Sequence, residues 1–539
     1  MPKLRVNGHK IHSRAGISVL AALQNQGLWT VRTSVSGKPR GPLCGMGVCY
    51  ECRCLVDGRV QKSCQVTVQE GMEVETAEGK DSLSSQTLLE EVAEGREQKA
   101  EGKKELTLSP HEKNRSSSQA KQFPQGLGLQ PSAFCSIPSA FSLLPSTNSL
   151  LIIGAGPAGI AAARAASRAC QVTLLDDNPR IGGQIWREKE GLKLPENVQV
   201  LSGAPITGVL DDKTLLVAGQ KLHFERLILA TGARELLLPF PGWTLPGVVG
   251  AGGLQAMIKS GLDVAGKRIV IAGSGPLLLA VAALAVQKGA QVVRILEQAP
   301  PKQLAPFLKS LTASKLLQAA GLGRIAATRY TSNAYVKAAL GTEKLEKVQY
   351  QSGERTLELE CDLLAVGYGL VPNLELAVQL GCRLDQGFVQ VDDTGKTSVA
   401  HIHAAGEITG IGGLDKALLE GEVAGLAATG QPIFSLVPRL QASHRFVRTL
   451  KTAFALRPEL QQLADSDTII CRCEDVRLAE VQGHTDWRSA KLHTRLGMGA
   501  CQGRTCGPIC QHLLGFDAPQ IRPPLFATPL EDLLLEEQP

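Results

Sequence analysis

The chain has 539 residues, a formal net charge of +6 and 14 cysteines. A chain of this length is expected to form about three or four domains, each able to bury its own core. The charge is small for the length and the basic residues are scattered, which argues against a nucleic acid or an anionic membrane as the partner. The start, MPKLRVNGHK, has no apolar signal core. We therefore expect a cytoplasmic protein whose cysteines stay reduced and free to bind metal.

Four cysteines near the start have the spacing C-x4-C-x2-C followed by one more: Cys44, Cys49, Cys52 and Cys64. This opening is the plant-type ferredoxin spacing, in which thiolates on a glycine-rich loop wrap a [2Fe–2S] cluster. Gly45 and Gly47 let the backbone fold tightly and offer N–H groups to the cluster sulfurs. A structural zinc site is the alternative, although zinc favours paired C-x2-C knuckles.

The residues around this loop predict a small β-grasp domain. Asn7-Gly8 predicts a hairpin turn, and GISVLAALQNQG predicts a short helix that ends at Gly27. Cys54 is predicted to pack inside the strand CRCLV and not to bind the cluster. The segment RTSVSGKPRGPLCGMGVCYECRCLVDGRVQKSC resembles the small [2Fe–2S] subunits of multi-subunit amino-acid and opine dehydrogenases.

Residues 81–147 differ in composition from the rest of the chain. They are rich in Glu, Lys, Ser and Gln and lack a sustained apolar period. This composition predicts a flexible linker with a transient charged helix at 86–101.

A nucleotide-binding fold is predicted to follow the linker. A strand over Leu150–Ile153 runs into a glycine turn, an alanine-rich helix and a second strand that ends at Asp176. The glycines permit the tight turn, the approach of a pyrophosphate and the packing of helix on strand, and the carboxylate can accept ribose hydroxyls. The glycines are Gly154, Gly156 and Gly159.

Three later motifs contribute Gly183, Gln184, Thr231, Gly232, Gly406 and Glu407. They resemble the pattern of two-dinucleotide-domain flavoproteins, which implies FAD at the first glycine turn. In that pattern the last motif lies near the flavin ribityl chain and pyrophosphate. Relatives usually have Asp at the position of Glu407.

A second nucleotide fold is predicted between the halves of the first, with Gly273, Gly275 and Glu297 in the corresponding positions. Leu278 stands where the third glycine belongs, and a bulky side chain there is expected to push the helix away from the strand. We therefore favour a retained fold without nicotinamide chemistry, with NAD or another nucleotide as the alternative. Glu297 would repel the additional phosphate of NADP.

The run Ile269–Val286 is apolar and long enough to suggest a membrane span. Its GSGP turn and the preceding Arg268 instead favour a strand, a turn and a buried helix. No transmembrane segment is predicted, and peripheral association with the inner face of the membrane stays open.

The segment ATGARELLLPFPGWTLPGVVGAGG, with GSGPLLLAVA, resembles the α-type flavoprotein subunits of sarcosine oxidase, opine oxidase and hydrogen cyanide synthase. Disulfide reductases of similar layout need a pair of cysteines beside the flavin. No cysteine lies between Cys170 and Cys361, which excludes a dithiol mechanism.

Near the end, IICRCEDV and RLGMGACQGRTCGPIC supply a second set: Cys471, Cys473, Cys501 and Cys506. The pattern resembles the bacterioferritin-associated-ferredoxin type of [2Fe–2S] domain, which implies a small helical fold with the cluster at helix N-termini. Zinc is again the alternative. Cys510 follows at helical spacing and competes with Cys506 for the fourth position.

The predicted fold class is multidomain α/β: a β-grasp ferredoxin domain, a glutathione-reductase-like pair of nucleotide folds and a small helical [2Fe–2S] domain. The predicted divisions are the ferredoxin domain (1–80), the linker (81–147), the first part of the FAD domain (148–244), the inserted NAD-like domain (245–360), the second part of the FAD domain (361–435) and the C-terminal cluster domain (436–539).

The resemblance implies a FAD and iron–sulfur subunit of a heteromeric amino-acid or opine dehydrogenase. It would pass electrons from a D-amino-acid-oxidase-like flavoprotein subunit, which oxidises glycine, an opine or D-hydroxyproline, to a quinone or other acceptor. A stand-alone NADH-dependent reductase and a scaffold that binds ATP or AMP are the alternatives. We assign no residue of this chain to substrate catalysis.

Overall fold

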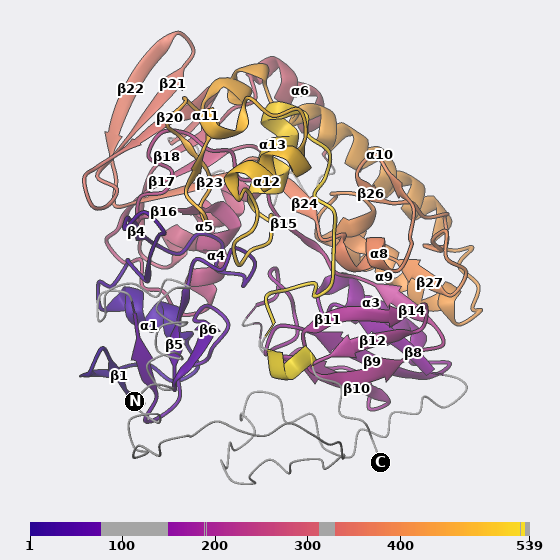
Figure 1. The fold of residues 1–539 in the computed structure, drawn as a ribbon. Coiled ribbons are helices and arrows are strands. Elements are labelled where there is room, and N and C mark those ends of the chain that lie inside the picture. The colour runs from indigo at the N-terminus through magenta and orange to yellow at the C-terminus, as the bar shows by residue number, and fades with distance from the viewer. Residues whose placement is uncertain (77–148, 188, 190, 312–328, 529, 534–539) are drawn as a thin grey trace, which may run out of the picture.

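The computed structural model describes residues 1–76, 149–187, 189, 191–311, 329–528 and 530–533. The predicted linker and its helix at 86–101 lie outside these residues. Figure 1 shows the N-terminal domain beside the two nucleotide folds, with the C-terminal helices packed over the second of them.

The N-terminal domain is a five-stranded sheet with one helix against it. Strands β1 and β2 pair antiparallel around Asn7 and Gly8, whose φ angles of 49° and 82° confirm the predicted hairpin turn. Helix α1 begins after Ser18, whose side chain accepts the N–H of Ala21. Cys54 is fully buried in β5, as predicted.

The sheet order is β2-β1-β7-β5-β6, and a two-stranded ribbon of β3 and β4 precedes the cysteine loop. The bounds are β1 (Lys3–Val6), β2 (His9–His12), α1 (Val19–Asn25), β3 (Arg32–Thr33), β4 (Pro39–Arg40), β5 (Arg53–Val56), β6 (Arg59–Lys62) and β7 (Glu73–Glu75).

The first nucleotide fold is a parallel sheet in the order β10-β9-β8-β14-β27. Helices α3 and α9 pack closely because Gly421 and Gly425 of α9 face the backbone of α3, where a Cβ would lie 2.1 Å from Ala158 O and 2.4 Å from Ala162 O. The bounds are β8 (Ser149–Ile153), α3 (Pro157–Ala166), β9 (Gln171–Asp176), β10 (Val198–Ser202), β14 (Leu227–Leu229), β27 (Ile402–Ala404) and α9 (Leu414–Ala428).

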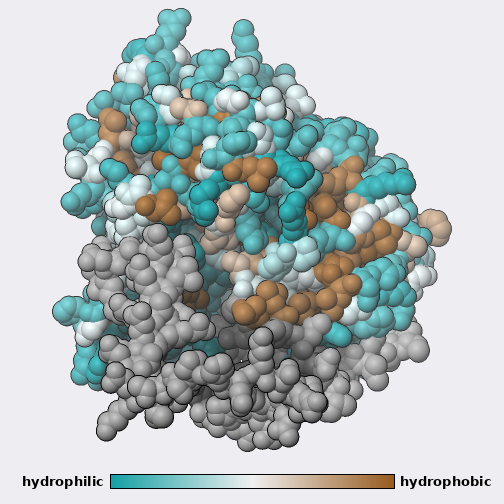
Figure 2. Space-filling model, in the orientation of Figure 1, coloured by the Kyte–Doolittle hydropathy of each residue, from teal (hydrophilic) through white to brown (hydrophobic). Residues whose placement is uncertain are grey.

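Smaller elements extend this fold. They are the antiparallel strands β11 (Ile206–Asp211), β12 (Thr214–Val217) and β13 (Gln220–His223), the crossing pair β15 (Ala233–Glu235) and β24 (Leu370–Pro372), helix α8 (Glu375–Gln379), and the pair β25 (Leu384–Asp385) and β26 (Phe388–Val389). Figure 2 shows apolar side chains gathered on the right-hand part of the visible face, over the region of α8 and β26.

The second nucleotide fold is a parallel sheet in the order β16-β23-β17-β18-β19. Strand β23 (Leu363–Gly367) lies between β16 and β17, so the predicted end of this fold at residue 360 is wrong. The apolar run LLAVG returns to the sheet as an inner strand with every residue buried. The second fold therefore continues through Gly367.

The apolar run Ile269–Val286 forms a strand, a turn and a helix, as predicted. None of the described helices is long and apolar enough to cross a membrane. The bounds of this fold are β16 (Val248–Gly250), α4 (Ala251–Lys259), β17 (Arg268–Gly273), α5 (Leu277–Gln287), β18 (Gln291–Glu297), α6 (Pro301–Ser310) and β19 (Tyr330–Ser332), with an antiparallel sheet of β20 (Ala334–Leu340), β21 (Lys347–Ser352) and β22 (Arg355–Glu360).

Helix α10 (Val437–Ala453) packs on α6, where the ring of Phe307 lies 5.9 Å from Phe446 and 5.1 Å from Phe454. The C-terminal cysteine domain follows, with β28 (Ile469–Cys471), β29 (Val476–Arg477), α11 (Leu478–Val481), α12 (Trp487–Thr494) and α13 (Cys506–Leu514).

The chain then returns to the first nucleotide fold. The N–H of Leu525 donates to the carbonyl of Thr207 on β11 at 2.7 Å, and the Leu525 side chain is buried in the core of that fold. The C-terminal segment therefore belongs structurally to the first fold as well as to the cysteine domain.

Candidate cofactor sites

One cavity of about 1860 Å³ connects the parts of the molecule that the sequence singles out. It is lined by Gly156 of the first glycine turn and Gly275 of the second. Met46 of the N-terminal cysteine loop and Arg504 of the C-terminal cysteine loop line it as well. Both nucleotide turns and both cysteine loops therefore meet at a single space.

The three glycines of the first turn have different physical roles. A Cβ on Gly154 would lie 2.3 Å from Ala230 O, and a Cβ on Gly159 would lie 1.8 Å from Gly154 O. A Cβ on Gly156 would meet nothing within 4 Å. Gly154 and Gly159 thus permit the close packing of strand and helix, whereas Gly156 leaves room at the N-terminus of α3, where a phosphate is favoured.

Asp176 lies at the end of β9 and lines the cavity. Its carboxylate accepts the N–H of Ala155 at 2.5 Å and that of Asn178 at 2.8 Å. Burial raises the pKa of this carboxyl group to about 6. The carboxylate is held beside the glycine turn, where a ribose hydroxyl can reach it.

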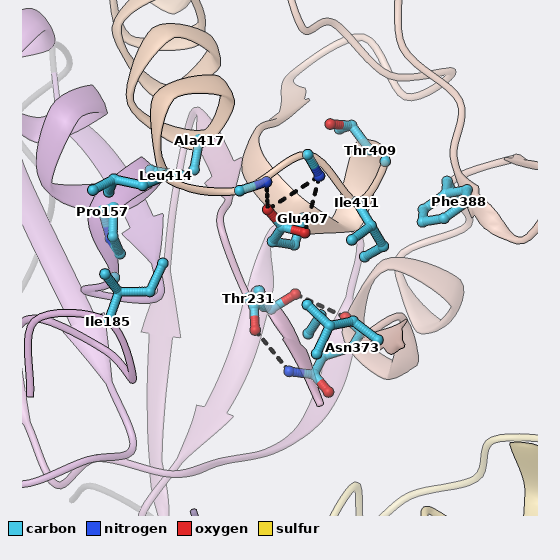
Figure 3. Close-up of a pocket in the computed structure, with 18 of the residues that line it drawn as sticks. Pro157, Ile185, Thr231, Asn373, Phe388, Glu407, Thr409, Ile411, Leu414 and Ala417 are labelled. Carbon is cyan, nitrogen blue, oxygen red and sulfur yellow. Dashed lines mark hydrogen bonds between the residues drawn. The ribbon is translucent and has the colours of Figure 1, made fainter. Parts of the chain in front are cut away.

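The remaining motif residues of the first fold converge on the same end of the cavity. Gly183, Gln184, Thr231, Gly232 and Glu407 line it. Figure 3 shows Thr231 opposite Asn373, and the two residues exchange hydrogen bonds of 2.7 and 2.8 Å.

Gly406 lies behind the cavity wall, because a Cβ on it would approach the Ala158 Cβ to 2.8 Å. Its neighbour Glu407 turns to the N-terminus of α9, where the carboxylate accepts the N–H of Gly413 at 2.7 Å (Figure 3). Burial raises the pKa of Glu407. The longer side chain therefore keeps its carboxylate at the cavity, bonded to backbone donors.

Sequence reasoning missed Lys416, a buried cation beneath this motif. Its ammonium donates to Gly406 O at 2.8 Å and pairs with Glu420 at 2.6 Å. Glu420 in turn accepts the N–H of Gly406 at 3.0 Å. The Gly406 turn is thus fixed by a charged pair on α9, which only the tertiary fold brings beneath it.

The second glycine turn has a similar backbone and a different acidic residue. A Cβ on Gly273 would lie 1.8 Å from Gly367 O, whereas one on Gly275 would meet nothing within 4 Å. Glu297 accepts the N–H of Gly275 at 2.8 Å and that of Ala299 at 2.9 Å. It is fully buried and, unlike Asp176, is not among the residues that line the cavity. Burial raises its pKa to about 7.

Leu278 is 1% exposed and packs in the core that the second nucleotide fold shares with the N-terminal domain. The side chain of Leu278 also lines the cavity, whereas the corresponding position of the first fold, Gly159, has no room for a side chain. At the position of the missing glycine, the second fold therefore has a buried side chain that packs in the core.

The four thiols of the N-terminal loop lie in two hydrogen-bonded pairs. Cys44 is a hydrogen-bond neighbour of Cys49, and Cys52 of Cys64. Backbone N–H groups of Met46 and Cys49 donate to the Cys44 sulfur at 3.3 and 3.4 Å. The hydrogen bond from Cys49 lowers the pKa of Cys44 to about 6, which favours a thiolate.

The C-terminal thiols form two similar pairs, Cys471 with Cys506 and Cys473 with Cys501. Cys506 is the first residue of α13, where the helix dipole favours an anion. Cys510 lies one turn farther along α13, and burial raises its pKa to about 12. The choice of Cys506 as the fourth ligand stays a prediction.

In each set the four thiols form two pairs, and a [2Fe–2S] cluster takes two thiolates on each iron, so both ligand sets stay predictions. In the described part of the chain, no three His, Cys, Asp or Glu side chains converge on the position of a single metal ion. Gly45 and Gly47 adopt φ angles of 58° and 79°, a backbone that turns N–H groups toward the thiols.

Sequence reasoning missed two further residues, of which Arg187 ties the N-terminal cysteine loop to Gln184 at the cavity wall. Arg187 donates to Gly45 O at 3.1 Å and to the Gln184 side chain at 2.8 Å. Glu235 accepts the N–H groups of Gly252 and Gly253 at the start of α4, and burial raises its pKa to about 7. The sequence signal for Glu235 was its position, because a charged residue directly before the apolar run LLLPF is unusual.

Residues 148–431 match the family described as pyridine nucleotide-disulphide oxidoreductase, and residues 2–79 match the 2Fe-2S iron-sulfur cluster binding domain. The chain belongs to the pyridine nucleotide-disulphide oxidoreductase family. It is a FAD-dependent oxidoreductase with an N-terminal [2Fe–2S] domain.

Two relatives support this membership, and one solved structure shares the fold. Hydrogen cyanide synthase subunit HcnB of Pseudomonas protegens is 31% identical over 68% of this chain and 91% of its own length. An opine oxidase subunit of Agrobacterium tumefaciens is 31% identical over 69% and 87%. The fold resembles that of L-proline dehydrogenase from P. horikoshii, with a TM-score of 0.64 and 20% identity over 99% of this chain and 97% of that one. The predicted resemblance to subunits of this kind is confirmed.

Proposed function

We propose that the chain is the electron-relay subunit of a multi-subunit amino-acid or opine dehydrogenase. The observation that carries the proposal is the single cavity shared by the first glycine turn and both cysteine loops. The relatives from hydrogen cyanide synthase and opine oxidase are themselves named as subunits.

FAD supplies two-electron chemistry when bound, whereas iron–sulfur clusters carry one electron at a time. The chain's own residues would prepare the exchange. The open backbone at Gly156 and the carboxylate of Asp176 would bind the pyrophosphate and the ribose. Met46 and Val48 bring the N-terminal cysteine loop to the cavity wall.

The proposed partner is a D-amino-acid-oxidase-like flavoprotein subunit, which would take a hydride from the carbon next to an amine of glycine, an opine or D-hydroxyproline. Its two electrons would pass to this chain and on to a quinone or other acceptor. The cavity offers apolar and backbone groups around the flavin site, and we assign none of its residues to an amine substrate.

Anaerobic mixing of the purified chain with NADH, glycine, D-hydroxyproline or octopine tests the proposal. We expect the flavin absorbance to persist with each compound alone and to bleach when the amine substrate is added together with the partner subunit. Bleaching by an amine without the partner would make the chain itself the dehydrogenase and contradict the relay.

A stand-alone NADH-dependent reductase is the second candidate, because rhodocoxin reductase of Rhodococcus erythropolis is 30% identical over 48% of this chain. Rapid bleaching by NADH alone would establish it. The full burial of Glu297 supports the relay, since a ribose in the usual position must reach that carboxylate.

A further inference from the structure

A buried ion pair connects the two cysteine loops. Glu51 lies immediately before Cys52, and Arg472 immediately follows Cys471. The Arg472 Nε lies 3.4 Å from Glu51 Oε1, and the two side chains are 2% and 1% exposed. Residues 421 positions apart in the chain thus place opposite charges against each other, each beside a predicted cluster ligand.

A third charged residue clamps this pair. Arg32 on β3 donates from one Nη to both carboxylate oxygens of Glu51, at 3.0 and 3.1 Å. The same nitrogen donates to the backbone carbonyl of Arg472 at 2.9 Å. Arg32 therefore binds the side chain of one loop and the main chain of the other.

Arg472 is also anchored to the flavoprotein part. It donates to Trp243 O at 3.0 Å, and its guanidinium carbon lies 5.1 Å from the centre of the Trp243 ring. A weaker bond of 3.4 Å reaches Gly41 O. These contacts hold the Arg472 side chain between the two cysteine loops and the flavoprotein part.

Stability alone does not account for this arrangement. Removing charges from water costs several kcal/mol for each ion, and apolar residues of similar volume often replace a buried triad without loss. Glu51, Arg32 and Arg472 together carry one net positive charge between two sets of thiols that bind anionic clusters. Their charge and position thus bear on both sets at once.

We propose that Glu51 and Arg472, held by Arg32, join the two cysteine loops into one electron-transfer unit, by fixing the clusters against each other and setting both potentials together. The inference rests on the proposed function, since it needs a [2Fe–2S] cluster at each loop. In the step concerned, a reduced cluster held by one loop would give one electron to an oxidised cluster held by the other. No bond forms or breaks, and no proton moves. The three residues are positioning residues.

The substitution Glu51→Gln tests this inference, because it keeps the shape of the side chain and removes its charge. Loss of a negative charge close to both clusters favours the reduced form of each. We expect both midpoint potentials to rise in an anaerobic redox titration followed by electron paramagnetic resonance, and Arg472→Gln to lower both. If both signals persist and only one potential changes, or neither, the proposal is wrong.

Arg40→Gln is the matched control. Arg40 pairs with Asp475 at 2.5 Å across the same interface, and the two side chains are 5% and 6% exposed. This variant removes a buried ion pair of the same kind that is not placed between the cysteines of either loop. We expect smaller shifts of both potentials than with Glu51→Gln, and equal shifts would reduce the triad to a general interface contact and overturn the proposal.

A measurement on the unaltered chain keeps the test independent of folding in the variants. In the fully reduced protein the two signals must show magnetic interaction, and two independent signals would contradict the inference. Iron content separates this outcome from failure of the proposed function. A chain with fewer than two clusters contradicts the proposed function. Two clusters whose midpoint potentials do not change in the Glu51→Gln variant contradict only the coupling.

Discussion

At the scale of single residues, the first nucleotide turn separates glycines that shape the backbone from the glycine that leaves space. Gly154 and Gly159 are enclosed by backbone atoms, and Gly156 faces the open cavity with an ordinary φ of −76°. A side chain at Gly156 can therefore disturb a bound cofactor without straining the fold.

Gly156→Val is expected to abolish FAD binding and to leave the protein folded, because the branched side chain occupies the place of the pyrophosphate. Flavin absorbance after purification and the iron content measure the two effects. Gly483→Val serves as the control, since a Cβ at Gly483 also meets nothing within 4 Å. Full flavin content in the Gly156 variant would place the cofactor elsewhere.

Glu297 predicts a pH dependence of stability. Burial raises its pKa from 4.5 to about 7 in the folded chain, so the folded state binds more protons than the unfolded state between these values. Its contribution is fully present below pH 4.5 and is lost as the pH rises through about 7. Glu297→Gln does not titrate, and its single amide oxygen keeps an acceptor for one of the two N–H groups, which bind different carboxylate oxygens in the parent.

We therefore expect the melting temperature of the Glu297→Gln variant, relative to that of the parent, to increase as the pH rises from about 5 to about 8. Differential scanning calorimetry at several pH values measures the difference. Parallel curves for the two proteins would show that Glu297 is not the group that titrates.

At the scale of elements, Leu278 makes α5 a packing element. Replacing it by Ala removes a fully buried side chain and is expected to cost about 2–5 kcal/mol of stability. Leu308→Ala on α6 is the control, because that side chain is 54% exposed and surface changes stay within about 0.5 kcal/mol. Urea unfolding followed by fluorescence compares the two, and equal costs would mean that Leu278 does not hold the helix.

The elements that sequence could predict are those whose cause is local. The hairpin at Asn7, the glycine turns and the cysteine spacing each follow from the conformations their own residues allow. The cause of the remaining features lies far along the chain. Lys416 stabilises the turn at Gly406 by donating to its carbonyl, and Arg187 donates to the carbonyl of Gly45.

The same reason explains the wrong division at residue 360. A short apolar segment such as LLAVG fits either sheet by pattern, and only the pairing of β23 with β16 and β17 decides between them. Local sequence holds no record of which sheet a buried parallel strand joins.

At the scale of the whole molecule, the flavoprotein part and the C-terminal cysteine domain meet at Trp243. The indole is 1% exposed, and its Nε1 donates to Ile469 O at 2.7 Å, at the start of the C-terminal cysteine domain. The backbone carbonyl of Trp243 accepts from Arg472. One side chain of the flavoprotein part thus holds the C-terminal domain in place.

Trp243→Phe keeps the ring packing and leaves the Ile469 carbonyl without its indole donor, which is expected to cost about 1–3 kcal/mol. Limited proteolysis should then release the C-terminal domain faster than in the parent. Trp186→Phe, a change at a half-buried tryptophan of the first fold, is the control. Equal cleavage rates in all three proteins would show that the hydrogen bond does not hold the domain.

The return of Leu525 to β11 fixes an order of events during synthesis. The sheet of the first nucleotide fold lacks its edge strand until residues 402–404 have been made, and its core lacks Leu525 until nearly the whole described chain has followed. At a synthesis rate of about 5–20 residues per second, the first strands wait for tens of seconds. The N-terminal domain, by contrast, is complete within its first 76 residues. During synthesis the N-terminal [2Fe–2S] domain can therefore fold early, whereas the core of the first nucleotide fold is completed last.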